Sequence, residues 1–193
     1  MGREFELKYR VPRKMQPQIL ADFPGEWTSY TMETTYYDTP GRELGRLRWT
    51  LRRRYENGRS VCAIKTPAFG GGRGEWETDC DDILEAIPVL CKLGAPEELP
   101  NFTRDGLETV CGARFTRQAA LITLEDCTVE LALDSGVLTG GGRERMLSEL
   151  EVELKSGSEK AAVAYAKALA AKYALRPEKK SKYRRALELA SET

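Results

Sequence analysis

The sequence predicts an α+β fold in which antiparallel strands close into one barrel and helices pack on its outside. Three observations lead to this prediction. Many segments alternate apolar and charged residues with the period of a strand. Short turn signals separate these segments, and two alanine-rich or amphipathic helical segments follow at the end. The stretches EFELK at 4–8 and ELEVELK at 149–155 echo each other, which indicates one barrel over residues 1–193 rather than two domains.

The first half of the chain is expected to supply most of one side of this barrel. Asn57-Gly58 is a strong hairpin signal between two strands, and Asp38-Thr39-Pro40-Gly41 is a turn. Asp81 is a suitable N-cap for a helix. The predicted elements are a strand over 3–10, a helix over 12–22, strands over 31–37, 46–56, 59–66 and 75–79, and a helix over 81–93.

The second half repeats the strand pattern and ends in helices. The sequences Asp134-Ser135-Gly136 and Gly140-Gly141-Gly142 are expected to interrupt the strands. The predicted elements are a short helix over 103–111, strands over 114–124, 127–134 and 146–155, and helices over 159–173 and 181–189.

The composition excludes several classes of function. The 30 basic and 30 acidic residues cancel, which argues against a general nucleic-acid binder. The chain has no histidine, so Ser-His-Asp and Cys-His catalysis and histidine-ligated zinc are excluded. The 5 cysteines form no CxxC pair and are interpreted as reduced structural thiols. With no signal peptide and no membrane-spanning apolar run, we expect a soluble cytoplasmic protein.

The charged residues fall on one face of each predicted strand. The other face of the same strands is apolar, as Leu150, Val152 and Leu154 illustrate. Solvent-exposed strand faces usually mix small polar residues, whereas these faces are dominated by Glu and Arg. The aligned residues are Glu4, Glu6, Lys8 and Arg10; Arg52 and Arg54; Arg73, Glu75 and Glu77; Glu130 and Asp134; and Glu149, Glu151, Glu153 and Lys155.

If helices cover the outside of a closed barrel, these charged faces line its interior. Several carboxylates in one lumen repel each other unless cations share it, and hard divalent ions prefer oxygen ligands of this kind. Several Arg and Lys side chains in the same lumen call for a polyanion, because guanidinium groups match phosphate oxygens. The pattern therefore predicts a site for a metal and a polyphosphate.

The chain also resembles a known family, the CYTH superfamily of triphosphate tunnel metalloenzymes. Glu4 to Lys8 matches its ExExK signature. The ordered set of further motifs runs over almost the whole chain: Thr35 to Pro40 (TYYDTP), Leu51 to Arg54 (LRRR), Ile64 to Thr66 (IKT), Arg73 to Glu77 (RGEWE), Glu130 to Asp134, Glu149 to Glu151 and Ser181 to Tyr183 (SKY).

This resemblance implies an eight-stranded antiparallel tunnel that binds a triphosphate with Mg²⁺ or Mn²⁺. By resemblance, the metal ligands would be Glu4, Glu6, Glu149 and Glu151. The phosphates would be bound by Lys8, Arg52, Arg54, Lys65, Arg73, Arg117 and Lys182. Glu75, Glu77, Glu130 and Asp134 would support the basic residues or the metal. The resemblance leaves Arg114 open in place of Arg117, and Glu153 is interpreted as a structural or rim residue.

The resulting hypothesis is metal-dependent hydrolysis of a phosphoanhydride bond, with inorganic triphosphate as the substrate and Lys8, Glu4 and Glu6 closest to the chemistry. Thiamine triphosphate, nucleoside triphosphates and cyclisation of ATP stay open as alternatives, as does a polyphosphate-binding module without turnover. The expected partner is a small-molecule triphosphate and neither nucleic acid nor membrane. A homodimer is left open.

Overall fold

The computed structural model describes residues 5–23, 27–67 and 73–192, without the side chain of Arg73. The strands are β1 Glu6–Arg10, β2 Thr28–Asp38, β3 Thr50–Glu56, β4 Arg59–Pro67, β5 Arg73–Asp79, β6 Glu108–Thr123, β7 Cys127–Gly140, β8 Arg143–Gly157 and β9 Arg176–Pro177. The helices are α1 Gln16–Asp22, α2 Glu43–Arg46, α3 Ile83–Lys92, α4 Leu99–Phe102, α5 Glu159–Lys172 and α6 Lys182–Ala190, with a 3-10 turn at Arg13–Met15 before α1.

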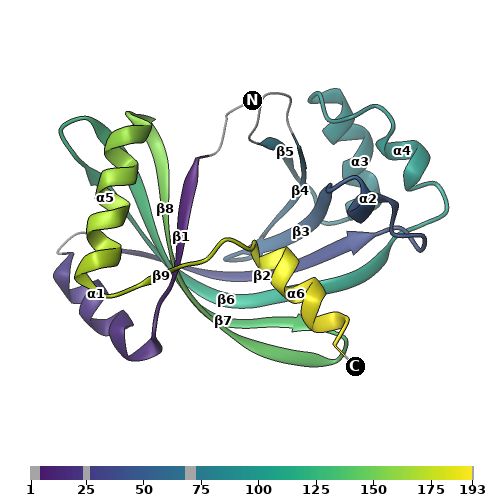
Figure 1. Ribbon diagram of the computed structural model, residues 1–193. Coiled ribbons are helices and arrows are strands. Elements are labelled where there is room, and N and C mark those ends of the chain that lie inside the picture. Colours follow the sequence, from purple (N-terminus) through teal and green to yellow (C-terminus); the bar gives the residue numbers. More distant parts are fainter. Residues whose placement is uncertain (1–4, 24–26, 68–72, 193) are drawn as a thin grey trace.

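These strands form one antiparallel sheet in the order β5-β4-β3-β2-β6-β7-β8-β1-β9. The sheet is strongly curved, as Figure 1 shows. The prediction of antiparallel strands with helices is confirmed, but the prediction of a closed eight-stranded barrel is wrong. In the described residues, the free edge of β1 pairs with the two-residue β9 and not with β5. After Pro177, the N–H of Glu178 donates to the carbonyl oxygen of Lys8 at 2.8 Å, and β9 does not extend further.

Helices cover the outer, apolar face of the sheet at both ends. On one side, α5 packs Ala162, Ala166 and Leu169 against a cluster that includes Leu131 and Leu150. At the other end, α3 and α4 cover β3 and β4; this cluster contains Leu51, Ile64, Ile87, Leu90 and Leu99. Figure 1 shows α1 and α5 together on one flank, and α3 with α4 on the other. The apolar residues of the strands therefore face the helices, as their alternation predicts.

The C-terminal helix, α6, fills one end of the inner face. Figure 1 shows it in yellow, crossing β6 and β7. Ala186 joins Phe115, Leu138 and Leu147 in a third apolar cluster, so the inner face is charged along only part of its length. Gly140 permits this close approach, because a Cβ atom there would lie 2.4 Å from the carbonyl oxygen of Ala186.

Three local features differ from what the sequence predicts. The segment predicted as a helix over 103–111 is a turn followed by the start of β6, whose residues pair with β2 instead. Asp134 to Gly136 do not interrupt β7, since Gly136 lets the backbone of Arg114 and Phe115 approach without a side chain between them. The strand β9 is only two residues long, which is too short to show a periodicity.

Asp38 organises the turn that follows β2. Its side chain is buried, and Oδ1 accepts hydrogen bonds from the backbone N–H groups of Thr39 at 2.8 Å and Leu44 at 3.0 Å. Oδ2 accepts one from the N–H of Gly45 at 3.0 Å. The carboxylate therefore satisfies the free N–H groups of the short helix α2 and fixes the chain that leads into β3.

Replacing Asp38 by alanine should lower the free energy of unfolding by about 1–3 kcal/mol, because buried N–H groups lose their acceptor. The measurement is urea denaturation followed by circular dichroism. Asp105→Ala, at an exposed position, is the matched control and should change stability by less than about 0.5 kcal/mol. Equal midpoints for the two variants would contradict the capping role of Asp38.

Candidate functional site

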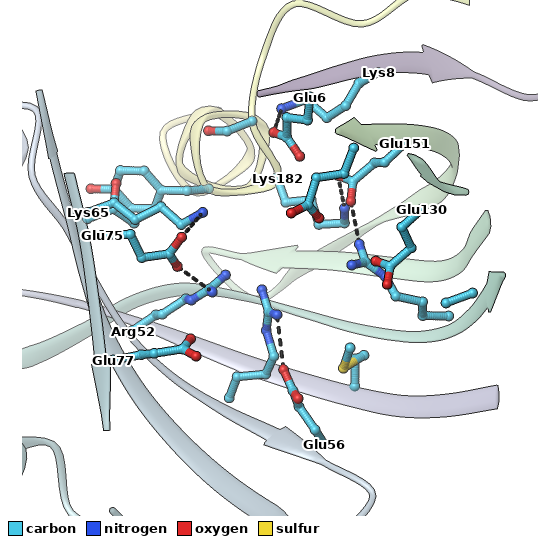
Figure 2. Close-up of a pocket in the computed structure, with 18 of the residues that line it drawn as sticks. Glu6, Lys8, Arg52, Glu56, Lys65, Glu75, Glu77, Glu130, Glu151 and Lys182 are labelled. Carbon is cyan, nitrogen blue, oxygen red and sulfur yellow. Dashed lines mark hydrogen bonds and ion pairs between the residues drawn. The ribbon is translucent and has the colours of Figure 1, made fainter. Parts of the chain in front are cut away.

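The inner face of the curved sheet encloses a cavity of about 750 Å³. Figure 2 shows charged side chains pointing into it from opposite walls, with Glu6 and Lys8 on one side and Lys65, Glu75 and Arg52 on the other. The sequence-predicted residues that line it are Glu6, Lys8, Arg52, Arg54, Lys65, Glu75, Glu77, Arg117, Glu130, Glu151 and Lys182. Residues from seven strands and α6 thus meet in one place.

Of the other four sequence-predicted side chains, two are not described and two are buried. Glu4 and the side chain of Arg73 lie outside the described residues. Asp134 and Glu149 face inward but are fully buried below the cavity, where α6 covers them. Strand parity gave the correct face for both acids, but it carries no information about how far α6 reaches over that face.

The structure distinguishes the two arginines of β6. Arg117 lines the cavity, and its guanidinium group binds Asp134 through two hydrogen bonds of 2.8 Å. Arg114 instead lies on the surface and pairs with the exposed Glu144. In this part of β6, the odd-numbered residues therefore point inward, as Phe115 also does.

The wall formed by β3, β4 and β5 carries linked ion pairs. Glu75 accepts from Arg52 at 3.2 Å through Oε1 and contacts the ammonium group of Lys65 at 3.0 Å through Oε2. Arg54 pairs with Glu56 at 3.1 Å. The Nε atoms of Arg52 and Arg54 are buried and have no hydrogen-bond partner among the described residues. Such donors favour an anion in the cavity.

Arg54 lies among other cations. Its burial, together with the charges of Arg52 and Arg117, lowers the pKa of Arg54 from its ordinary value. This direction means that the positive charge of Arg54 is incompletely compensated by Glu56. An anionic ligand beside it would relieve the repulsion among the three arginines.

Lys182 is the centre of a buried ion cluster beneath the cavity. Its ammonium nitrogen lies 2.7 Å from Asp134 Oδ2 and 2.8 Å from Glu151 Oε1, and it also contacts Glu149. Glu151 accepts in addition from Arg117, and Glu149 from Arg185. Three carboxylates and three cations therefore balance within this cluster.

The pKa values in this cluster follow from burial and from these neighbours. Burial acts to lower the pKa of Lys182, but Glu151, Asp134 and Glu149 outweigh it and raise that pKa. Burial acts to raise the pKa of Glu151, but Lys182 and Arg117 hold it well below its usual range. For Glu149 burial prevails, and its pKa is raised.

Asp134, Glu149 and Glu151 are also the described acids that bring three carboxylate oxygens within 4.8 Å of one another. This arrangement alone would suit a divalent cation. However, the ammonium group of Lys182 contacts all three carboxylates and thus occupies the position between them. The cluster is therefore already neutralised by the chain itself.

A second group of acids borders the cavity. Glu6 of β1 lies opposite Glu153 of β8, which lies opposite Glu130 of β7, so three acids form a row across adjacent strands. Their side chains are 27%, 27% and 25% exposed, respectively. Lys8 contacts Glu6 at 2.7 Å, and Lys155 contacts Glu153 at 2.9 Å and Glu130 at 3.6 Å. Acids directly opposite one another favour a further cation.

Sequence reasoning missed several residues around the cavity. Glu153 and Lys155 were placed on the inward face of β8, but neither was assigned to the site. Glu56 follows Arg54 by two positions and so shares its face. Arg185 could have been found from its position three residues after Lys182, on the same face of α6.

Burial makes two of the cysteines unreactive. It raises the pKa of Cys62 and of Cys111 to about 12. Neither thiol is therefore ionised at neutral pH, which excludes both as thiolate nucleophiles. All five cysteines are free, as the interpretation of reduced structural thiols requires.

Comparison with known proteins identifies the family. Residues 2–187 match the CYTH domain. The chain belongs to the CYTH family. An inorganic triphosphatase from Haemophilus influenzae is 30% identical over 167 residues, which are 82% of this chain and 47% of that protein. The chain thus spans about half the length of this curated relative.

Solved structures share the CYTH fold over nearly the whole chain. HpAC1 from Hippeastrum, described as an adenylyl cyclase candidate with a dominant triphosphatase activity, superposes with a TM-score of 0.65 and 17% identity, covering 96% of this chain and 95% of its own. The PH1819 protein from Pyrococcus horikoshii gives 0.62 and 20%, covering 96% and 99%. Among the described residues, no helix is both long and apolar enough to cross a membrane.

Proposed function

We propose that this CYTH protein is a metal-dependent triphosphatase that hydrolyses a phosphoanhydride bond, with inorganic triphosphate as its substrate and residues 1–193 as one domain. The observation that carries the proposal is the charge of the cavity. Its described lining contains seven basic and seven acidic side chains. Because the lining is neutral as a whole, a triphosphate bound there brings uncompensated negative charge, which a divalent cation beside the acids would balance.

The basic side chains would bind the phosphates. Arg52 and Arg54 have buried Nε donors without partners, and Lys8, Lys65, Arg117 and Lys182 surround the same cavity. We also assign Arg73 to this set, following its motif. Fixed donors around the phosphates would stabilise the charge that develops on the leaving group as the bond breaks.

Mg²⁺ or Mn²⁺ fits the carboxylates that border the cavity. Glu6 and Glu153 would hold it, with Glu130 next to them and Glu4 added from its motif. Glu151 also borders the cavity and would be a ligand by its motif, but it already contacts Lys182 and Arg117. Glu149 is less suitable than its motif implies, because it is fully buried and contacts Lys182 and Arg185. When bound, the metal would neutralise phosphate charge and activate a water molecule for attack.

Side chains of the protein would orient the phosphates and accept the proton of the attacking water. Lys8 is held by Glu6 at 2.7 Å, so its ammonium group is fixed beside the acidic row and can orient a phosphate oxygen. Glu75 fixes Arg52 and Lys65 together, which sets the spacing of two phosphate-binding cations. With no histidine in the chain, a cavity carboxylate would accept the proton of the attacking water.

The aromatic residues of the cavity favour an inorganic substrate. Three tyrosines border it, Tyr30, Tyr36 and Tyr183. The rings of Tyr36 and Tyr183 pack against each other with centroids 5.1 Å apart, and Tyr36 is only 4% exposed. Tyr30 is half-buried and packs against the same cluster. These rings are thus engaged in the cluster under α6 and offer little face for stacking an adenine or thiamine ring.

The test is a phosphate-release panel on the purified protein with inorganic triphosphate, thiamine triphosphate and ATP, each with Mg²⁺, with Mn²⁺ and with excess chelator. We expect kcat/KM to be highest for inorganic triphosphate and release to stop in the chelator. Binding of triphosphate without release from any substrate would replace the proposal by a polyphosphate-binding module. A preference for ATP with formation of cyclic AMP would replace it by a cyclase.

A further inference from the structure

Lys182 differs from the other described cations of the cavity because a helix, and not a strand, carries it. The register of the sheet fixes Lys8, Arg52, Arg54, Lys65 and Arg117. Lys182 is instead the first residue of α6, after the N-cap Ser181. Its position therefore depends on how α6 is held against the sheet.

Arg185 supplies a charged anchor for α6. It lies one turn after Lys182, its side chain is 11% exposed, and it pairs with the fully buried Glu149 of β8. Its second nitrogen, Nη1, lies 3.8 Å from Glu178 Oε2. Glu178 also accepts from Arg10 Nε of β1 at 2.6 Å and from the N–H of Lys180 at 2.9 Å. The helix is thereby tied to two strands and to the segment before it.

Glu149 lies between two cations. One of its oxygens, Oε1, contacts the ammonium group of Lys182, and the other, Oε2, contacts the guanidinium group of Arg185. Without Arg185, three buried carboxylates would share only Arg117 and Lys182. Lys182 would then be drawn more strongly to Glu149, which is away from the cavity, and would be less available to an anionic ligand.

We propose that Arg185 and Glu149 are positioning residues: Arg185 balances Glu149, so that the ammonium group of Lys182 stays at the cavity wall and available to the phosphates of the substrate. This inference rests on the proposed function. It assigns Glu149 a role in positioning Lys182 and makes Arg185 part of the phosphate-binding machinery although it touches no substrate.

The test is a double-mutant cycle with Arg185→Met, Glu149→Gln and the combined variant, assayed for triphosphate hydrolysis and for thermal unfolding without ligand. Arg185→Met should raise KM about tenfold, within the range of coupling in a shared ion network, with a smaller effect on kcat. The combined variant should recover most of that loss, because two carboxylates again face two cations. Arg184→Met, an exposed residue paired with Glu188, is the control and should leave KM unchanged.

A purely structural role would give a different pattern. Both single variants would unfold at lower temperature, and the added Glu149→Gln change would not restore the KM of Arg185→Met. That result, or an unchanged KM in Arg185→Met, overturns the inference. A wild type that hydrolyses no substrate but is stabilised by triphosphate would refute only the proposed function. The increase in Tm on adding triphosphate would then replace KM: Arg185→Met should reduce it, and the combined variant should restore it. A wild type that neither hydrolyses nor binds triphosphate overturns both.

Discussion

Replacing Glu6 and Glu153 together by glutamine should lower metal-dependent triphosphate hydrolysis by at least about a hundredfold, since losing one group that stabilises transition-state charge typically costs ~2.7–4 kcal/mol. The two acids lie opposite each other on β1 and β8 and border the cavity with Glu130. The change keeps the size of both side chains but removes two negative charges. The loss should appear mainly as a weaker affinity for Mn²⁺, measured by isothermal titration calorimetry alongside kcat/KM.

Two comparisons make this result specific. Glu144→Gln alters an exposed acid of β8 paired with Arg114 and should leave Mn²⁺ affinity and hydrolysis unchanged. Glu149→Gln should also retain Mn²⁺ binding, because its carboxylate contacts Lys182 and Arg185 beneath the cavity. If Glu149→Gln abolished Mn²⁺ binding and the Glu6 and Glu153 variant kept it, the metal would lie in the buried cluster instead.

The second large effect is on stability. Lys182→Met should lower the free energy of unfolding by about 3–5 kcal/mol, because it leaves three buried carboxylates with two cations. Lys182 contacts Asp134, Glu149 and Glu151, and two of these acids are fully buried. For a chain of this size, Tm should fall by roughly 2–4 °C for each kcal/mol lost.

The measurement is thermal unfolding followed by circular dichroism at neutral pH. Lys180→Met is the matched control, because that lysine is 53% exposed and pairs with Glu188 of α6. An exposed pair of this kind contributes less than about 1 kcal/mol. If both variants had the same Tm, the buried cluster would not hold α6 against the sheet.

Much of the fold was predictable because its strands carry unambiguous alternation. EFELK showed an apolar and a charged face, and the structure places Leu7 against the outer cluster while Glu6 and Lys8 border the cavity. The turn residues Asn57-Gly58 likewise predicted a hairpin, and this hairpin joins β3 to β4. In both cases a local signal and the global arrangement agree.

The rest depended on contacts between segments distant in the sequence. Alternation assigns Glu149 and Glu153 to one face of β8, but only the packing of α6 decides that Glu149 is buried and Glu153 borders the cavity. Closure of the sheet also lay beyond local signals, because it depends on which segment meets the edge of β1. The two residues of β9 are too few to form a sequence pattern that predicts this pairing.

The open arrangement of the sheet has a mechanical consequence. β1 with its acids and β5 with Glu75 come from opposite ends of the strand order, and no backbone hydrogen bond joins them in the described residues. The distance between these walls is therefore set by the curvature of the six strands that lie between them in the sheet. A triphosphate that contacts both walls would act as a cross-link, substituting ion pairs for the missing strand contact. Ligand binding and rigidity of the sheet should accordingly rise together.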